Sequence, residues 1–363
     1  MTLTPAERVR GALRSLLDGA DPVPADPVAF RSAVFDHGLA WVHFPPGWGG
    51  LGVDPHFQGP VDEQLRAAGP VDSPSAFMVG MELVAPTLAV HGTDHQRHAY
   101  LRRIFTCEDL WCQLFSEPGA GSDLASLATL ATRVDGGWSV TGQKVWTTMA
   151  HRARWGLLLA RTDPDVVKHK GITCFVVDMS APGVEVRPLR QLTGDAEFNE
   201  VFLTEVRIPD SQRVGDAGRG WSVAMTTLGN ERLVGDNLLG AGRGAGPIAT
   251  AVGLWARPST ERTPGLRDEL LRLWAAAEVA RLSSLRSAAL RGAGLADPTV
   301  SMAKNTAAQL QQRIYNLASR LRGAEALLID GYEMVQRDQV AQLVGDDTDL
   351  NKALLASLAS TIA

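Results

Sequence analysis

The sequence has little of what would point to export, a membrane or a metal centre. Its three cysteines, Cys107, Cys112 and Cys174, are too few for a disulfide framework, and the 107–112 spacing is not that of a metal-binding pair. The longest apolar stretch, residues 76–90, is interrupted by Glu82 and is too short to cross a bilayer. The N-terminus has no hydrophobic signal region. We therefore expect a cytoplasmic protein without a metal ion.

Positive charge is not in excess either. The 35 Lys and Arg residues face 40 Asp and Glu residues, so the formal net charge is −5. No overall basic field is available to attract nucleic acid or an anionic membrane. The glycine-rich 113–123 segment is neither a GxGxxG nor a P-loop sequence, and the chain contains no HExxH or GxSxG sequence. The 45% apolar and 21% charged fractions are typical of a soluble globular chain, and 363 residues suffice for two or three packed units.

Turn signals divide the chain into three zones that we expect to be domains. Residues 1–110 show helical spacing of apolar residues, residues 111–219 carry short strand-like segments, and residues 220–363 return to helical spacing. The 135–137 segment (DGG) predicts a hairpin. Because no long helix separates the strands, we expect an antiparallel barrel or sandwich rather than a parallel sheet. The predicted fold class is α+β, with an N-terminal helical domain, a central antiparallel β-barrel and a C-terminal helical bundle.

An apolar seam predicts a long helix in the C-terminal zone. Its members alternate at spacings of four and three residues, as in packed helices. They are Ala303, Ala307, Leu310, Ile314, Leu317 and Leu321.

Two segments of the central zone are candidates for binding a ligand. Residues 113–123 (QLFSEPGAGSD) predict a strand that runs into a glycine-rich loop, where Ser116, Ser122 and backbone N–H groups offer donors to an anion or a polar ring. Residues 142–148 (GQKVWTT) place an indole, Trp146, beside Thr147 and Thr148, which suits a planar cofactor with a polar edge. Each segment also has a plainer interpretation, a surface turn for the first and sheet packing for the second.

A carboxylate on the predicted helix after the strands is a candidate general base. Glu231 belongs to a stripe of small and apolar residues on one helix face, which indicates that it points inward. Burial would raise its pKa toward the range useful for a base. An ordinary solvated glutamate is the alternative. The following Arg232 is suited equally to an anionic ligand group or to pairing with an acid. The other members of the stripe are Ala224, Leu228, Gly235 and Leu238.

Together these segments resemble the acyl-CoA dehydrogenase family of flavoproteins. The resemblance covers nearly the whole chain, and its motifs occur in the family's order and spacing. They are residues 48–52 (WGGLG), 92–96 (GTDHQ), 116–123 (SEPGAGSD), 142–148 (GQKVWTT) and 230–232 (NER). The family's layout is an N-terminal helical domain, a β-barrel and a helical bundle, with FAD bound between the last two.

The resemblance implies roles for the candidate residues. A carboxylate removes the α-proton of an acyl-CoA thioester while hydride leaves the β-carbon for the flavin, and Glu231 occupies the position at which a minority of members carry this base. Ser122 would contact the pyrophosphate or the CoA chain, and Arg232 would lie beside the catalytic site. The flavin ring would lie against Gln113, Phe115 and Ser116, with Trp146 and Thr148 on its other side near the flavin N5.

The family's usual C-terminal base segment is not found, since the sequence ends at residues 360–363 (STIA), which favours Glu231 as the base. Two other departures from the family pattern bear on assembly. The Arg-x-x-Phe-Gly motif, which holds a neighbouring subunit's FAD, is replaced at residues 256–265, and a Gly-Gly-x-Gly turn is replaced at residues 321–326. Within the resemblance, this loss implies a heteromer.

The expected assembly is an α2β2 heterotetramer with a homologous acyl-CoA dehydrogenase subunit. It resembles the actinobacterial type that degrades steroid side chains as bulky CoA thioesters, and an electron-transfer flavoprotein would accept the electrons. The alternatives are a non-catalytic structural subunit of such a complex, and an acyl-CoA oxidase or flavin monooxygenase of the same fold.

Overall fold

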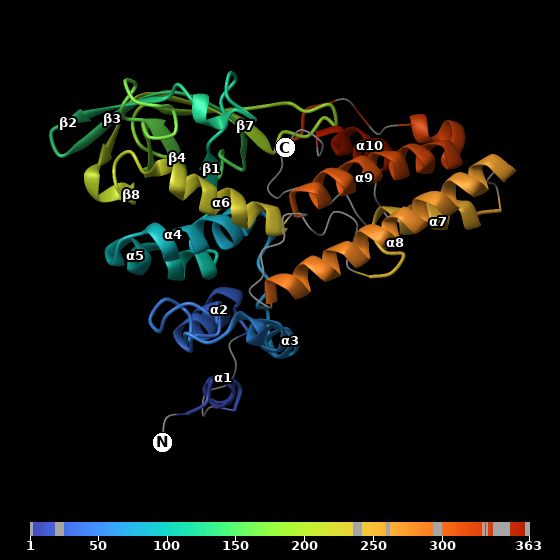
Figure 1. The fold of residues 1–363 in the computed structure, drawn as a ribbon, viewed down its shortest axis with the longest axis horizontal. Coiled ribbons are helices and arrows are strands. Elements are labelled where there is room, and N and C mark those ends of the chain that lie inside the picture. Colours follow the sequence, from blue (N-terminus) through green and yellow to red (C-terminus); the bar gives the residue numbers. More distant parts are fainter. Residues whose placement is uncertain are drawn as a thin grey trace. The chain divides into compact units, whose positions relative to one another are not determined.

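The computed structural model describes residues 3–18, 25–234, 242–258, 262–292, 300–328, 331, 333–336 and 349–359. These residues form two compact units, which we describe separately (Figure 1). The first holds the described residues up to Leu189 together with Glu197–Asn230. The second holds Arg190–Ala196 and the described residues from Glu231 onward.

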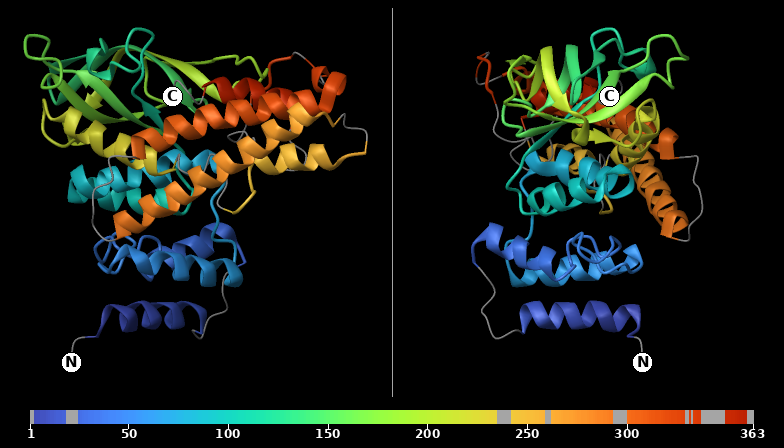
Figure 2. Two further views of the ribbon diagram at one scale, coloured as in Figure 1. Left: turned by 45° about the vertical axis from the view of Figure 1, so that its right-hand side comes forward. Right: turned by 90° about the vertical axis from the view of Figure 1, so that its left-hand side faces the viewer.

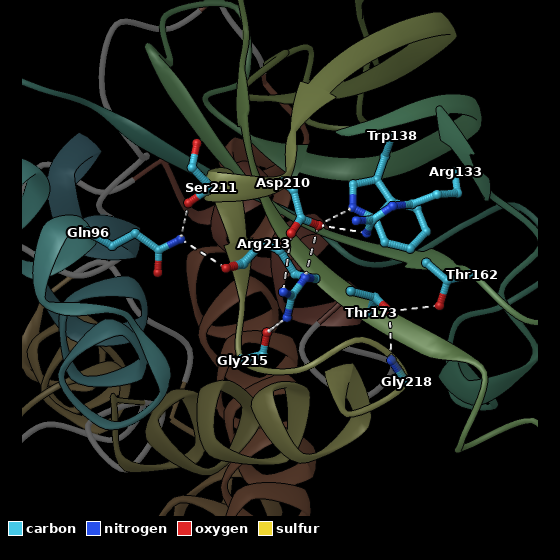
Figure 3. Close-up of polar contacts among 10 residues, drawn as sticks. All are labelled: Gln96, Arg133, Trp138, Thr162, Thr173, Asp210, Ser211, Arg213, Gly215 and Gly218. Atoms are coloured by element: carbon cyan, nitrogen blue, oxygen red, sulfur yellow. Dashed lines mark hydrogen bonds and ion pairs between the residues drawn. The ribbon is translucent and has the colours of Figure 1, made fainter. Parts of the chain in front are cut away.

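The first unit begins with helices, of which α1, α2 and α5 have side-chain N-caps. Helix α5 has Thr93 as its N-cap, and the Thr93 side chain and the Gln96 side chain bond each other's backbone N–H in a capping box. The Gln96 amide also donates to the backbone oxygens of Ser211 and Arg213, which joins α5 to the segment after the last long strand (Figure 3). The helices are α1 (Pro5–Leu17), α2 (Pro27–Asp36), α3 (Gln58–Ala68), α4 (Ala85–His91) and α5 (Asp94–Phe105), and a π-helical turn, η3 (Val79–Val84), precedes α4.

One eight-stranded sheet follows, with a core of alternating apolar side chains. Its order is β6-β7-β3-β2-β4-β5-β8, and β1 pairs with β4. The predicted hairpin is confirmed: β2 and β3 are joined at Asp135–Gly136, where Gly136 has a φ of 76°. The strands are β1 (Trp111–Leu114), β2 (Leu130–Val134), β3 (Gly137–Thr148), β4 (Trp155–Arg161), β5 (Ile172–Asp178), β6 (Val184–Pro188), β7 (Phe198–Pro209) and β8 (Arg213–Val214).

The expectation of a purely antiparallel barrel needs correction. Strand β1 runs parallel to β4, with Trp111 opposite Trp155, and Leu130 of β2 also pairs in parallel with Arg161 of β4. The β2–β3 hairpin lies between β1 and β4 in the chain, so the chain can return in the same direction without a crossover helix. The sheet is therefore mixed, although most of its pairs are antiparallel.

Helix α6 (Gly220–Val234) follows the sheet, and its residues through Asn230 belong to the first unit. The second unit is helical. The predicted seam is confirmed on α9, where Leu310, Ile314 and Leu317 are buried against Leu273 of α8 and other apolar side chains. Figure 2 shows α8 and α9 side by side in both views. These helices are α7 (Pro247–Ala256), α8 (Pro264–Gly292), α9 (Val300–Arg322) and α10 (Leu350–Ala359).

Among the described residues, no helix is long and apolar enough to span a membrane. The α+β architecture is confirmed.

Candidate functional site

A β-bulge turns Trp146 out of the sheet. The β3–β7 register shifts between Lys144 and Thr147, where two residues of β3 lie opposite Glu200 of β7. Trp146 takes a left-handed backbone conformation there, with a φ of 60°. Bulges bend a strand and redirect side chains, and a left-handed non-glycine residue is strained. As a result, the Trp146 side chain is 58% exposed near the end of β3, between the half-buried Val145 and the buried Thr147.

An aromatic ring of the neighbouring strand stands beside the exposed indole. The Phe198 ring meets Trp146 edge-on, with ring centroids 6.0 Å apart. Phe198 is also the register partner of the half-buried Thr148. Trp146, Thr148 and Phe198 therefore form an aromatic and hydroxyl-bearing surface. The sequence motifs did not identify Phe198, because only the β3–β7 pairing brings it to this place.

The two predicted ligand-binding segments are brought together. The Val145 N–H donates to the Ser116 carbonyl at 2.9 Å. The Lys144 ammonium donates to the Phe115 carbonyl at 3.0 Å and lies 2.8 Å from the Glu117 carboxylate. The glycine-rich loop therefore begins directly beside the bulge that carries Trp146. This buried ion pair was also not predicted from the sequence.

Burial and charge pairing have opposite effects on the pKa of each member of the pair. Burial lowers the pKa of Lys144 to about 8, against the opposing effect of the Glu117 carboxylate. Burial alone would raise the pKa of Glu117, but the nearby Lys144 ammonium and hydrogen bonds hold it below its usual range. The lysine side chain is 0% exposed and the glutamate side chain 7% exposed.

The loop that follows Glu117 closes on itself and leaves its glycines open. Glu117 and Ala120 exchange two backbone hydrogen bonds. A Cβ atom added at Gly119 or Gly121 would meet nothing within 4 Å. Within the described part of the chain, the N–H groups of Gly121 and Ser122 have no hydrogen-bond partner, and Ser122 is exposed. Such a backbone suits an anionic group.

Two predicted contacts lie inside the fold instead of on its surface. The Phe115 side chain is 2% exposed and that of Thr147 is 1% exposed. Successive residues of a strand point to opposite sides, so Thr147 faces inward where Trp146 and Thr148 do not. Any contact of Phe115 with a ligand would have to come from its backbone. Gln113 and Ser116 are half-buried, with the Gln113 Oε1 atom unpaired among the described residues.

The candidate base lies near the end of α6. Glu231 is half-buried, one turn beyond the fully buried Thr227, and Ala224 on the same stripe is also buried. The described part of the stripe is therefore buried at Ala224 and half-buried at Leu228 and Glu231. Gly235 and Leu238 lie outside the described residues, and so does the side chain of Arg232. Glu231 belongs to the second unit, and the flavin candidates belong to the first.

No group of His, Cys, Asp and Glu side chains within the described ranges could hold a metal ion. The described groups fit a different ligand. They are an exposed indole with a hydroxyl-bearing residue, Thr148, nearby, and a glycine-rich loop with free N–H groups. These suit a planar ring with a polar edge and a phosphate group.

Comparison with known proteins supplies the family. Three family models match successive parts of the chain: the acyl-CoA dehydrogenase N-terminal domain over residues 17–108, the middle domain over residues 112–206 and the C-terminal domain over residues 218–343. The acyl-CoA dehydrogenase IpdE1 of Mycolicibacterium smegmatis is 35% identical over 308 residues, which cover 82% of this chain and 76% of that protein. The chain belongs to the acyl-CoA dehydrogenase family.

Other acyl-CoA dehydrogenases align over part of their length. Acyl-CoA dehydrogenase FadE34 of Mycobacterium tuberculosis is 55% identical over 201 residues, or 55% of this chain, but the alignment spans only 28% of FadE34. Among solved structures, a variant of the Tcur3481-Tcur3483 steroid ACAD superimposes with a TM-score of 0.72 at 25% identity and covers 99% of this chain and 90% of that chain. Members of the acyl-CoA dehydrogenase family generally use FAD, and the donor set described above fits that cofactor.

Proposed function

We propose that this chain is the base-carrying subunit of an FAD-dependent acyl-CoA dehydrogenase that forms a carbon–carbon double bond in a bulky acyl-CoA thioester. Glu231 is the single observation on which the proposal depends. It is the carboxylate at the NER motif of α6, on a stripe whose preceding members are the buried Ala224 and the half-buried Leu228.

In this proposal the Glu231 carboxylate takes the α-proton of the thioester as the β-hydrogen departs with its electron pair. FAD, when bound, supplies the two-electron acceptor for that hydride. The chain's own residues bind and orient the ring: Trp146 and Thr148 offer a flat face and a hydroxyl, and Ser116 offers polar groups beside them. The open loop at Gly119–Ser122 would take the phosphates through its N–H groups. Alignment of the reacting atoms is the protein's main contribution to the rate.

The partner and the substrate class follow the same proposal. A homologous subunit would provide the FAD-holding motifs that residues 256–265 and 321–326 do not contain, in an α2β2 complex. The resemblance to the Tcur3481-Tcur3483 steroid ACAD supports both a two-chain assembly and a steroid-type CoA thioester. An electron-transfer flavoprotein would then reoxidise the enzyme.

The test uses the complex co-purified with its homologous subunit. Glu231→Gln removes the base but keeps the side-chain size, and Glu185→Gln, on the exposed face of β6, is the matched control. FAD per protomer is measured by absorbance, and anaerobic bleaching by steroid-type CoA thioesters is followed in a stopped-flow instrument. We expect unchanged FAD content and bleaching slowed by at least about 10²-fold in Glu231→Gln, with normal bleaching in the control. Bleaching at the wild-type rate in Glu231→Gln would assign the base elsewhere.

Two other outcomes would favour the alternatives. A wild-type complex that binds FAD but is bleached by no CoA thioester in the panel would indicate a structural subunit. Rapid reaction of the reduced flavin with oxygen would instead favour an acyl-CoA oxidase or a monooxygenase.

A further inference from the structure

The ion pair between Glu117 and Lys144 has no role in the function proposed above. It is buried on both sides, and the two charged groups are 2.8 Å apart. A buried ion pair is weak support for stability, because desolvation of the charges offsets their attraction and apolar replacements are often neutral. Stability alone therefore does not explain why a buried ion pair lies between the two candidate ligand-binding motifs.

The pair connects three segments of the first unit. The Lys144 ammonium donates to the Phe115 carbonyl at the end of β1 as well as to the Glu117 carboxylate. That carboxylate in turn accepts the N–H groups of Ala128 at 2.6 Å and Thr129 at 3.0 Å, just before β2. Both charges are thus satisfied by groups of the chain itself, and every contact joins segments that are distant in sequence.

The residues held by these contacts are neighbours of the candidate flavin contacts. Ser116 lies between Phe115 and Glu117, and its carbonyl accepts the Val145 N–H. Trp146 follows Val145 on the bulge, in the strained left-handed conformation. Strained backbone persists where the surrounding structure overdetermines it, and the ion pair lies at the start of the bulge.

We propose that the Glu117–Lys144 pair is a positioning device that fixes Ser116 and Trp146 relative to each other, and so sets the pose of the flavin ring without contacting it. The identity of the ring rests on the proposed function. The geometry of the Glu117–Lys144 pair does not rest on the proposed function, since the chain alone makes all of its contacts. With almost no exposed surface, neither side chain can reach a ligand directly. The pair acts through the Phe115 carbonyl, the Ser116–Val145 hydrogen bond and the start of the bulge.

The test compares single and double variants of the FAD-loaded complex. Lys144→Met leaves a buried carboxylate unpaired, so we expect a lower melting temperature and loss of FAD. Glu117→Gln/Lys144→Met removes both charges, and we expect its melting temperature to return close to that of the wild type. Its visible circular dichroism and flavin midpoint potential should remain altered, and flavin reduction by substrate should fall about 10²-fold with little change in KM. Lys144→Arg keeps the charge and should restore the wild-type spectrum.

The control is the ion pair between Glu278 and Arg281 on α8, whose side chains are 19% and 20% exposed. Glu278→Gln/Arg281→Met should leave the flavin spectrum unchanged. A folded Glu117→Gln/Lys144→Met variant with the wild-type spectrum, potential and reduction rate would overturn the proposal. If that variant does not fold, Glu117→Gln alone decides, because an altered flavin spectrum supports the proposal and an unaltered one refutes it. The spectrum and potential need no acyl-CoA, so this result is independent of whether the proposed reaction is correct.

Discussion

The hydroxyls of Thr87 and Thr227 meet at 2.9 Å between α4 and α6, and both residues are fully buried. A second contact of the same kind joins His91 to Thr226 at 2.8 Å. Two polar contacts one helical turn apart on α4 restrict how α6 can rotate about its axis. Thr226 and Thr227 are therefore the points at which α6 is held against α4 within the first unit.

Thr227→Val should destabilise the protein by about 1 kcal/mol, the typical net value of one neutral hydrogen bond. The cost is limited because the Thr87 hydroxyl keeps its bond to the Leu83 carbonyl. Thr87→Val/Thr227→Val should cost less than the sum of the two single variants, since they remove the same contact. Urea unfolding of the three variants gives the coupling energy. Strict additivity would show that the two hydroxyls do not interact.

Trp146→Gly should give a more stable protein than Trp146→Ala, by about 1 kcal/mol. Both variants lose the same exposed ring, but only glycine relieves the left-handed backbone. The exposed Thr132 of β2 has ordinary strand geometry. There Thr132→Ala should be more stable than Thr132→Gly, because glycine weakens a strand. Urea unfolding of the four variants checks this. FAD titration should show weakened binding in both Trp146 variants. An alanine variant as stable as the glycine variant would mean that the bulge carries no strain.

The Asp210 carboxylate should stabilise the fold above about pH 4 and lose that effect as the pH falls toward 2. Hydrogen bonds from Arg213 and from the Trp138 indole lower its pKa to about 2 (Figure 3). A depressed carboxyl pKa adds stability while the group is ionised, and protonation removes it. The difference in unfolding free energy between wild type and Asp210→Asn should therefore be constant above pH 5 and narrow below pH 4. Asp165→Asn, at an exposed position, is the control. A difference in unfolding free energy between wild type and Asp210→Asn that stays constant down to pH 3 would contradict the prediction.

Much of the fold was predictable because local signals decide it. The 135–137 turn and the α9 seam depend on neighbouring residues, and both are confirmed. The parallel pairing of β1 with β4 was not predictable in this way, because it depends on where a distant strand enters the sheet.

In the candidate site, too, local sequence signals predicted some features, and others depend on pairing between distant segments. Motif order identified the segments around Ser116 and Trp146, and the structure brings those segments together. Strand alternation could have shown that Thr147 points away from its two neighbours. The Lys144–Glu117 pair and the Phe198 ring had no local signal, since both arise only from pairing between strands.

Substitutions in the glycine-rich loop should separate the effect on FAD binding from the effect on stability. Gly119→Ala and Gly121→Ala should change the unfolding free energy by less than about 0.5 kcal/mol, because their φ angles are not positive and the added Cβ meets no protein atom. If the loop takes the phosphates of FAD, the same methyl groups should weaken FAD binding. Gly136→Ala is the converse control: its positive φ predicts a loss of about 1 kcal/mol, with FAD affinity unchanged. Fluorescence titration with FAD and urea unfolding provide the two readouts. Wild-type FAD affinity in both loop variants would show that the phosphates bind elsewhere, even if Trp146 contacts the ring.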